Sequence, residues 1–345
     1  MNCSKNVGIV TENRIEFLDI AKGIAILLVV MGHLVQYNMT GTSATTVFDF
    51  IYSFHMPLFF MLSGYVAALR SESTSPFKYV KKKFISLVIP YFVWGGIISP
   101  LIWSHSSYTK LPQLWFDLFV YMKDGAWFLI VLFAIQMYYL FVILIGKLFT
   151  LRYRGIGEIL AFIFILSLVF IGSMYVDYIE KSTYFSFLFI LSFAGGVVLC
   201  RLFHGNLPKG VIFVCFALFT INVWRFHFNA SPSWLKLLLG MTGAILMIYT
   251  AQSMDRNSLS GIGTKLKKMI VFFGKNTIMI YLTHYLIVCV MKEILVDVST
   301  INPIPLFIFC LIAGTFITTI TIWISKVLQM VPYLSFCLYG KNASN

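Results

Sequence analysis

Long apolar runs constrain this chain more than any other feature of its sequence. Stretches of about twenty apolar residues recur along it, and a helix needs about 20 such residues to cross a bilayer. Hydrophobic residues make up 59% of the 345 positions and charged residues 11%, so a soluble globule would lack the charges to cover its surface. The sequence therefore predicts an all-α fold, a polytopic bundle of membrane-spanning helices.

About ten candidate spans can be read from the hydropathy pattern. They cover residues 18–37, 49–69, 84–103, 125–146, 158–176, 183–203, 210–226, 234–253, 269–291 and 303–327.

The distribution of cations predicts the orientation of these spans. With the spans placed, 18 of the 26 Lys and Arg side chains fall on one side of the membrane and five on the other. Cytoplasmic loops carry an excess of Lys and Arg, so this bias predicts an even number of spans with both termini in the cytoplasm. It also accounts for most of the net charge of +13 without a nucleic-acid partner. We expect a cytoplasmic segment over 1–14, a transmembrane domain over 15–330 and a cytoplasmic tail over 331–345.

Three histidines interrupt the apolar runs at a similar predicted depth. His33 follows Lys22 by eleven residues, which places it about 16 Å further along a helix, in the outer half of the bilayer. His55 and His284 fall in the outer half of two other spans, and Pro57 frees backbone groups near His55. A single histidine in a span is often a packing residue. Three at one depth favour a functional site, because ionisable groups are costly in a membrane.

Two further features allow either a structural or a functional interpretation. Asp19 and Lys22 are three positions apart and can share a helix face, so Asp19 either pairs with Lys22 or orients a base. Trp127 begins a span at the level of the histidines, where it is either an interfacial aromatic or a platform for a sugar.

A cluster of cations precedes the third span. Lys78, Lys81, Lys82 and Lys83 lie where the chain enters the membrane from the cytoplasmic side. Such a cluster either anchors the span to anionic lipid headgroups or binds a cytosolic polyphosphate. The six cysteines are scattered without metal-ligand spacing, so we expect no metal site.

Five segments resemble the acyltransferase-3 family of integral-membrane acyltransferases. They occur in the family's order along nearly the whole chain. They are Arg14 with LDIAKGIAILLVVMGH (Leu18–His33), SFHMPLFFMLSGY (Ser53–Tyr65), KKKFISLVIPYFVWG (Lys81–Gly95), AWFL (Ala126–Leu129) and FGKNTIMIYLTH (Phe273–His284). The first two are the most specific, and they are most similar to the fucose 4-O-acetylase-like or surface-polysaccharide O-acetyltransferase subgroup.

The resemblance implies a multi-pass protein of the bacterial cytoplasmic (inner) membrane. It implies transfer of an acetyl or other acyl group from acetyl-CoA to a hydroxyl of an envelope glycan or its lipid-linked precursor. The family's essential histidine corresponds to His33, and its conserved arginine corresponds to Arg14. Lysines stand at 81–83 where many relatives have arginines, and lysine cannot grip phosphate in a bidentate way.

These inferences assign roles to particular residues. His33 is expected to act as general base or acyl carrier, with Asp19 and His55 as further catalytic residues. The predicted donor-binding residues are Arg14, Lys22, Lys78, Lys81, Lys82 and Lys83. The predicted acceptor-binding residues are Trp127, His284 and Tyr65.

Two other classes of protein compete with the transferase. A transporter or flippase for a glycolipid or small solute would also carry histidines in its spans, but the chain shows no repeated halves. A structural scaffold would leave the three histidines unexplained. The oligomeric state stays open, with a homo-oligomer as one alternative.

Overall fold

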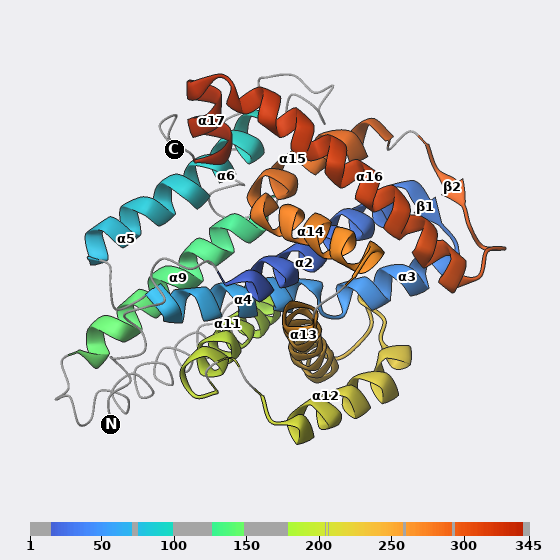
Figure 1. The fold of residues 1–345 in the computed structure, drawn as a ribbon, viewed down its shortest axis with the longest axis horizontal. Helices are drawn as coiled ribbons and strands as arrows, with labels where there is room; N and C mark the ends of the chain where they lie inside the picture. Colours follow the sequence, from blue (N-terminus) through green and yellow to red (C-terminus); the bar gives the residue numbers. More distant parts are fainter. Residues whose placement is uncertain are drawn as a thin grey trace.

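The computed structural model describes most of the chain as a helical bundle (Figure 1). The described residues are 15–70, 75–98, 126–147, 179–203, 205, 207–257, 260–291 and 294–340. Their helices are α2 (Glu16–Asn38), α3 (Thr42–Tyr52), α4 (His55–Arg70), α5 (Pro76–Lys83), η1 (Phe84–Val88), α6 (Ile89–Val93), η2 (Trp94–Ile98), α9 (Trp127–Gly146), α11 (Ile179–Arg201), α12 (Lys209–Asn222), η4 (Val223–Arg225), α13 (Ser233–Arg256), α14 (Ile262–Lys275), α15 (Thr277–Val290), α16 (Pro303–Gln329) and α17 (Pro332–Tyr339).

The predicted membrane bundle is confirmed in its coarse form. Within the described residues, five helices are long and apolar enough to cross a membrane, and α14 with α15 would make a sixth. The five are Glu16–Asn38, Thr42–Leu69, Trp127–Gly146, Ser233–Arg256 and Pro303–Gln329. The count of about ten spans and the cytoplasmic placement of both termini stay predictions. The expected span 158–176 lies outside the described residues.

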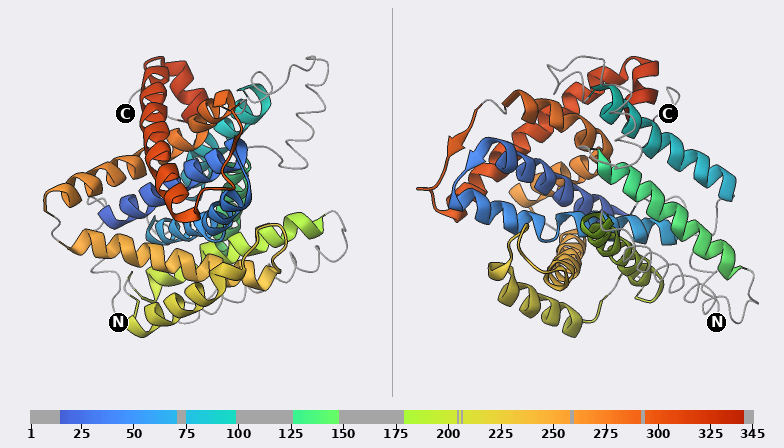
Figure 2. Two further views of the ribbon diagram at one scale, coloured as in Figure 1. Left: turned by 90° about the vertical axis from the view of Figure 1, so that its right-hand side faces the viewer. Right: turned by 180° about the vertical axis from the view of Figure 1, so that it is seen from behind.

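Helix α2 is the centre of the bundle. It contacts α3, α4, α13, α14, α15 and α16 (Figures 1 and 2). Two glycines permit close approach of α14: a Cβ atom on Gly23 would collide with the backbone of Ile270, and one on Gly274 with the backbone of Asp19. Small residues at a helix crossing let backbones approach closely, as in other membrane bundles.

Two expected spans are broken where side chains interrupt the helix. The span expected over 49–69 consists of α3 and α4, which meet just before Pro57, whose ring would clash with the carbonyl of Ser53. The span expected over 269–291 consists of α14 and α15, bent by 86°. The Asn276 amide donates to Phe272 O and the Thr277 hydroxyl donates to Gly274 O, each at a distance of 2.7 Å. These two bonds cap α14.

The third expected span starts earlier than predicted and stays helical to the end of the described segment. From Pro76 to Ile98 it passes from α5 through η1 and α6 to η2. The wide π-helical turns of η1 precede Pro90, which offers no N–H to the carbonyl four residues before it.

The segment 331–340, expected in a cytoplasmic tail, packs into the bundle as α17. The Trp94 indole donates to Leu338 O at a distance of 2.9 Å, and the Tyr339 and Thr283 hydroxyls lie 2.8 Å apart. Tyr339 is 1% exposed, so this part of the expected tail belongs to the folded unit.

A short parallel pairing closes one end of the bundle, at the right of Figure 1. Strand β1 (Met39–Thr40) continues from α2 and pairs with β2 (Val296–Asp297), which follows α15. Beyond β2, the hydroxyl and backbone N–H of Ser299 donate to the Asp297 carboxylate and lower its pKa.

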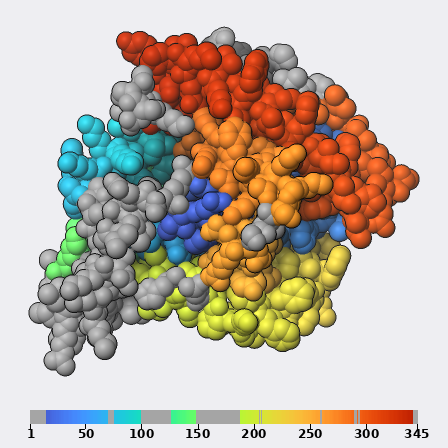
Figure 3. Space-filling view, in the orientation of Figure 1, coloured from blue at the N-terminus to red at the C-terminus, as the bar shows by residue number. Residues whose placement is uncertain are grey.

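The outer surface of the bundle is apolar. Large hydrophobic side chains of α12, η4 and α16 are exposed, among them Phe213, Trp224, Ile312 and Phe316. Figure 3 shows α16 running across the face of the molecule as a continuous red ridge. Such a surface suits contact with lipid acyl chains.

Candidate functional site

Three helices bring the predicted histidines to the same part of the bundle. His33 comes from α2, His55 from the start of α4 and His284 from α15. His33 Nδ1 and His284 Nε2 lie 2.8 Å apart, and the two rings are nearly parallel at 11°. We call the part of the bundle around these three residues the histidine end.

The hydrogen bonds fix which nitrogen carries the proton in each ring of the His33–His284 pair. His284 Nδ1 lies 2.8 Å from Ile280 O, and a carbonyl oxygen can only accept, so His284 Nδ1 carries a hydrogen. In a neutral imidazole the other nitrogen is then an acceptor. His284 Nε2 therefore accepts from His33 Nδ1–H, which leaves the lone pair of His33 on Nε2.

His55 is anchored separately. It is 3% exposed, and its Nδ1 lies 2.8 Å from Ile51 O in the preceding helix. Its ring packs edge-on against Tyr52 with 4.6 Å between centroids. A Cβ atom on Gly32 would come within 2.9 Å of the Tyr52 ring, so Tyr52 lies between His55 and the part of α2 that carries His33.

The sequence reasoning missed four residues near His33. The Tyr37 and Tyr285 hydroxyls lie 2.8 Å apart, and both rings meet His33 edge-on. The Tyr52 hydroxyl donates to Gln36 Oε1, with 2.8 Å between the two oxygens. One signal was available: Gln36 and Tyr37 follow His33 by three and four positions, the spacing of one helix face.

The predicted acceptor-binding residues do not all come together. His284 contacts His33. Trp127 is connected to this pair through its neighbour: Phe128 packs on Tyr281, and the Tyr281 ring lies 6.2 Å from the His284 ring. Trp127 itself stacks on Phe189 at 5.4 Å. Tyr65 contacts Phe17 near the start of α2 and lies ten residues beyond His55, which is about 15 Å along α4.

The predicted charged residues lie in two places, near the start of α2 and along α5. We call the regions of Lys22, Lys267 and Lys78–Lys83 the lysine end. Asp19 is 2% exposed and lies 3.6 Å from Lys22 Nζ. Asp19 precedes His33 by fourteen residues, about 21 Å along α2, so the structure does not bring these two predicted catalytic residues together.

The cations of the lysine end are held in different ways. Lys267 bridges Glu16 at 2.9 Å and Asp255 at 3.3 Å and so ties α14 to α2 and α13. Lys83 lies over the Tyr79 ring at 5.5 Å. Lys78, Lys81 and Lys82 are exposed on α5. Arg14 lies outside the described residues.

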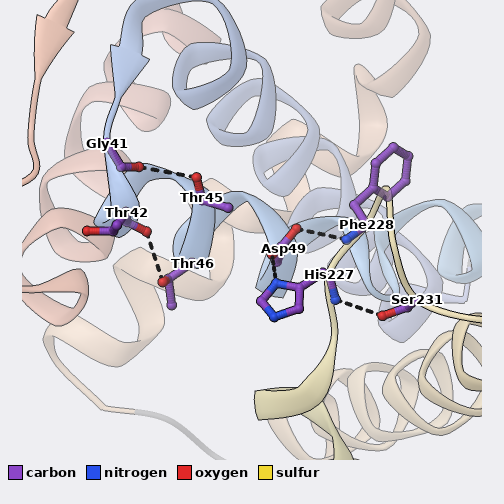
Figure 4. Close-up of polar contacts among 8 residues, drawn as sticks. All are labelled: Gly41, Thr42, Thr45, Thr46, Asp49, His227, Phe228 and Ser231. Carbon is purple, nitrogen blue, oxygen red and sulfur yellow. Dashed lines mark hydrogen bonds and ion pairs between the residues drawn. The ribbon is translucent and has the colours of Figure 1, made fainter.

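A polar latch secures the loop between α12 and α13 beside the histidine end (Figure 4). Asp49 on α3 accepts from the Phe228 N–H at 3.0 Å and meets His227 Nδ1 at 3.1 Å. Ser231 in turn accepts from the His227 N–H at 2.8 Å. The latch holds Phe228 against Phe48 and Tyr52.

The arrangement can take up and release a proton at His33. Within the described residues, no group of three or more His, Cys, Asp or Glu side chains is placed to hold a metal ion. What it offers is a partly exposed imidazole of defined tautomer at the histidine end of an apolar helical bundle.

Fold and site define a membrane-embedded helical protein with a histidine centre, and comparison with known proteins identifies its family. The profile of the acyltransferase-3 family, described as an acyltransferase domain, matches residues 15–324. The chain therefore belongs to this family and is an acyltransferase. No solved structure matches the chain.

Two curated relatives are similar over part of the chain. Nodulation protein NolL of Mesorhizobium japonicum is 40% identical over 110 residues, which are 30% of this chain and 28% of that protein. Nodulation protein NolL of Sinorhizobium fredii is 40% identical over 91 residues, 25% of each chain. The match thus spans little more than a quarter of these relatives.

Proposed function

We propose that the chain is a membrane O-acyltransferase that moves an acetyl group from cytosolic acetyl-CoA to a hydroxyl of a cell-envelope sugar, in the cytoplasmic membrane of a bacterium. The observation that carries this proposal is the ordered chain from Ile280 O through His284 to His33. It leaves the Nε2 lone pair of His33 as a base, and a general base is what a sugar hydroxyl needs to attack a thioester.

The proposed reaction moves one proton through His33. His33 Nε2 takes the proton of the acceptor hydroxyl while the oxygen of that hydroxyl bonds to the thioester carbonyl carbon. The carbon–sulfur bond then breaks, and the proton passes to the departing CoA thiolate. The charge that forms on His33 is stabilised because His33 Nδ1–H donates to His284, whose other nitrogen is fixed on Ile280 O. The same lone pair would also serve the second route, a transient acyl group on His33.

The lysine end supports binding of the donor. CoA carries several phosphate charges, and Lys78, Lys81 and Lys82 present exposed ammonium groups on one short helix. Lys22 and His33 are about 16 Å apart along α2. The pantetheine arm of CoA would cover this distance by extending between helices. The matched relatives are named for nodulation, a process and not a substrate, so the sugar acceptor rests on the resemblance of the motifs to surface-polysaccharide O-acetyltransferases.

The test is a transfer assay on the purified full chain in lipid nanodiscs. The chain is supplied with acetyl-CoA carrying a labelled acetyl group and with a panel of neutral methyl glycosides. Label recovered as a sugar ester supports the proposal. If no glycoside is acetylated, yet the protein in liposomes carries glycosides or glycolipids across the membrane, the transporter replaces the transferase.

A further inference from the structure

A side-chain amide is held one helical turn beyond His33. Gln36 and His33 are three positions apart on α2 and share a face of that helix, with about 5–6 Å between their Cβ atoms. Most of α2 is buried, yet Gln36 is exposed. The Tyr52 hydroxyl donates to Gln36 Oε1 over 2.8 Å. With Oε1 engaged in this way, the two N–H groups of the exposed amide are the donors left for a ligand.

Tyr52 is itself fixed from several sides. Its ring stacks on Phe48 at 3.9 Å and meets His55 edge-on at 4.6 Å. It covers Gly32, where any side chain would collide with it. Phe228, which the Asp49 latch holds in place, packs on the same ring at 5.1 Å. Because Tyr52 is held in place and bonds to Gln36 Oε1, the packing around Tyr52 also restricts the orientation of the Gln36 amide.

The direct partners in the cluster around this amide are uncharged, and the charges of Asp49 and Lys236 lie one contact further out, on Phe228. Within the described residues, the ring and hydrogen-bond contacts of His33, Gln36 and Tyr52 are with imidazole, phenol, amide and phenyl groups. Two N–H donors beside a base, in a neutral aromatic setting, match a neutral ligand with several hydroxyl oxygens. A charged acceptor would find no counter-ion among these contacts.

We propose that Gln36 binds the acceptor and selects which hydroxyl reacts. Its amide donates to one oxygen of a neutral sugar and so places the neighbouring hydroxyl at His33 Nε2. Tyr52 is a positioning residue that acts through Gln36. This inference rests on the proposed transfer function and names the acceptor class as a neutral sugar with adjacent hydroxyls.

The experiment compares Gln36→Met with the wild type in the nanodisc assay, using the methyl glycoside that the wild type acetylates fastest. Methionine keeps the length of the side chain and removes both donors. We expect the KM for the glycoside to rise about 3- to 10-fold, the loss of one neutral hydrogen bond, with the KM for acetyl-CoA unchanged. The acetyl group should also spread over more hydroxyls of the ring, as read by NMR of the products.

A double-mutant cycle tests the part played by Tyr52. Tyr52→Phe keeps the ring and should raise the glycoside KM in the wild type but add nothing to Gln36→Met. Thr46→Val is the matched control, because Thr46 is an exposed residue of α3 whose hydroxyl bonds only to Thr42 O at 3.0 Å.

Two outcomes overturn different claims. If the wild type acetylates the glycoside and Gln36→Met keeps its KM and its product pattern, the role of Gln36 is refuted while the transferase stands. If the wild type acetylates no sugar at all, the proposed function fails and this inference with it.

Discussion

The two ends of the bundle hold their polar groups in opposite ways. At the histidine end, His33 and His284 are bonded to each other and to Ile280 O, and their neighbours are neutral. At the lysine end, Lys267 is paired with two carboxylates while Lys78, Lys81 and Lys82 are exposed. The first region depends on short contacts of fixed geometry, and the second on charges that act at a distance and are screened by salt. The contrast fits an acceptor recognised by shape and a donor recognised by charge.

The largest effect is expected from His33→Ala. Loss of the base should lower kcat for acetyl transfer about 100- to 10,000-fold while the protein still folds, as judged by thermal melting in nanodiscs. Transfer by this variant at the wild-type rate would show that His33 takes no part in the reaction.

A smaller loss is expected from His284→Phe. Phenylalanine fills the space but cannot accept from His33 Nδ1–H, so the tautomer and orientation of His33 are no longer fixed. We expect kcat to fall about a hundredfold, toward the lower limit for general-base catalysis. His284→Gln, whose amide oxygen can accept a hydrogen bond from His33 Nδ1–H, should restore part of the activity. Equal activity in the two variants would show that His284 only packs.

Neutralising Lys81, Lys82 and Lys83 together to Gln should affect the donor alone. We expect the KM for acetyl-CoA to rise about tenfold at low salt and the difference to shrink at high salt. Lys209→Gln is the control, since Lys209 is exposed at the start of α12, away from the lysine end, and the charge changes in the same direction. A rise in the glycoside KM instead would contradict the division between the two ends.

The smallest effect is expected from Asp49→Asn. The amide keeps one acceptor for Phe228 N–H but loses the charge that faces His227, so the loop over 226–231 should be held less firmly. We expect a loss of about 1–2 kcal/mol in stability and a change in transfer of only a few fold. Limited proteolysis of the loop and thermal melting measure the first quantity. Unchanged melting would show that the latch contributes nothing.

The sequence predicted best what the bilayer itself dictates. The span expected over 18–37 is α2 (Glu16–Asn38), and the span expected over 303–327 is α16 (Pro303–Gln329). The thickness of the bilayer sets the length of an apolar run that crosses it, so the ends of such a run can be predicted within a few residues. The sequence also placed His33, His55 and His284 at one predicted depth, and the structure carries them on three helices with His33 and His284 in contact.

Which side chains meet could not be read in that way. His33 and His55 looked equivalent in the sequence, yet His33 bonds to His284 while His55 bonds to the carbonyl of Ile51 in its own chain segment. The choice depends on how α2, α4 and α15 rotate about their axes, which hydropathy does not encode. The bend at Asn276 was missed because local side-chain bonds ended α14 inside an apolar run.

The His33–His284 pair also ties activity to the order of synthesis. The two residues are 251 positions apart, one in the first described helix and the other near the end of the chain. At roughly 5–20 residues per second, a ribosome would need about 13–50 s between them. Until α15 has been inserted beside α2, the base at His33 has no partner to fix its proton. A truncated or half-inserted chain would therefore react with thioesters far more slowly, so full activity would arise only when α15 has joined α2.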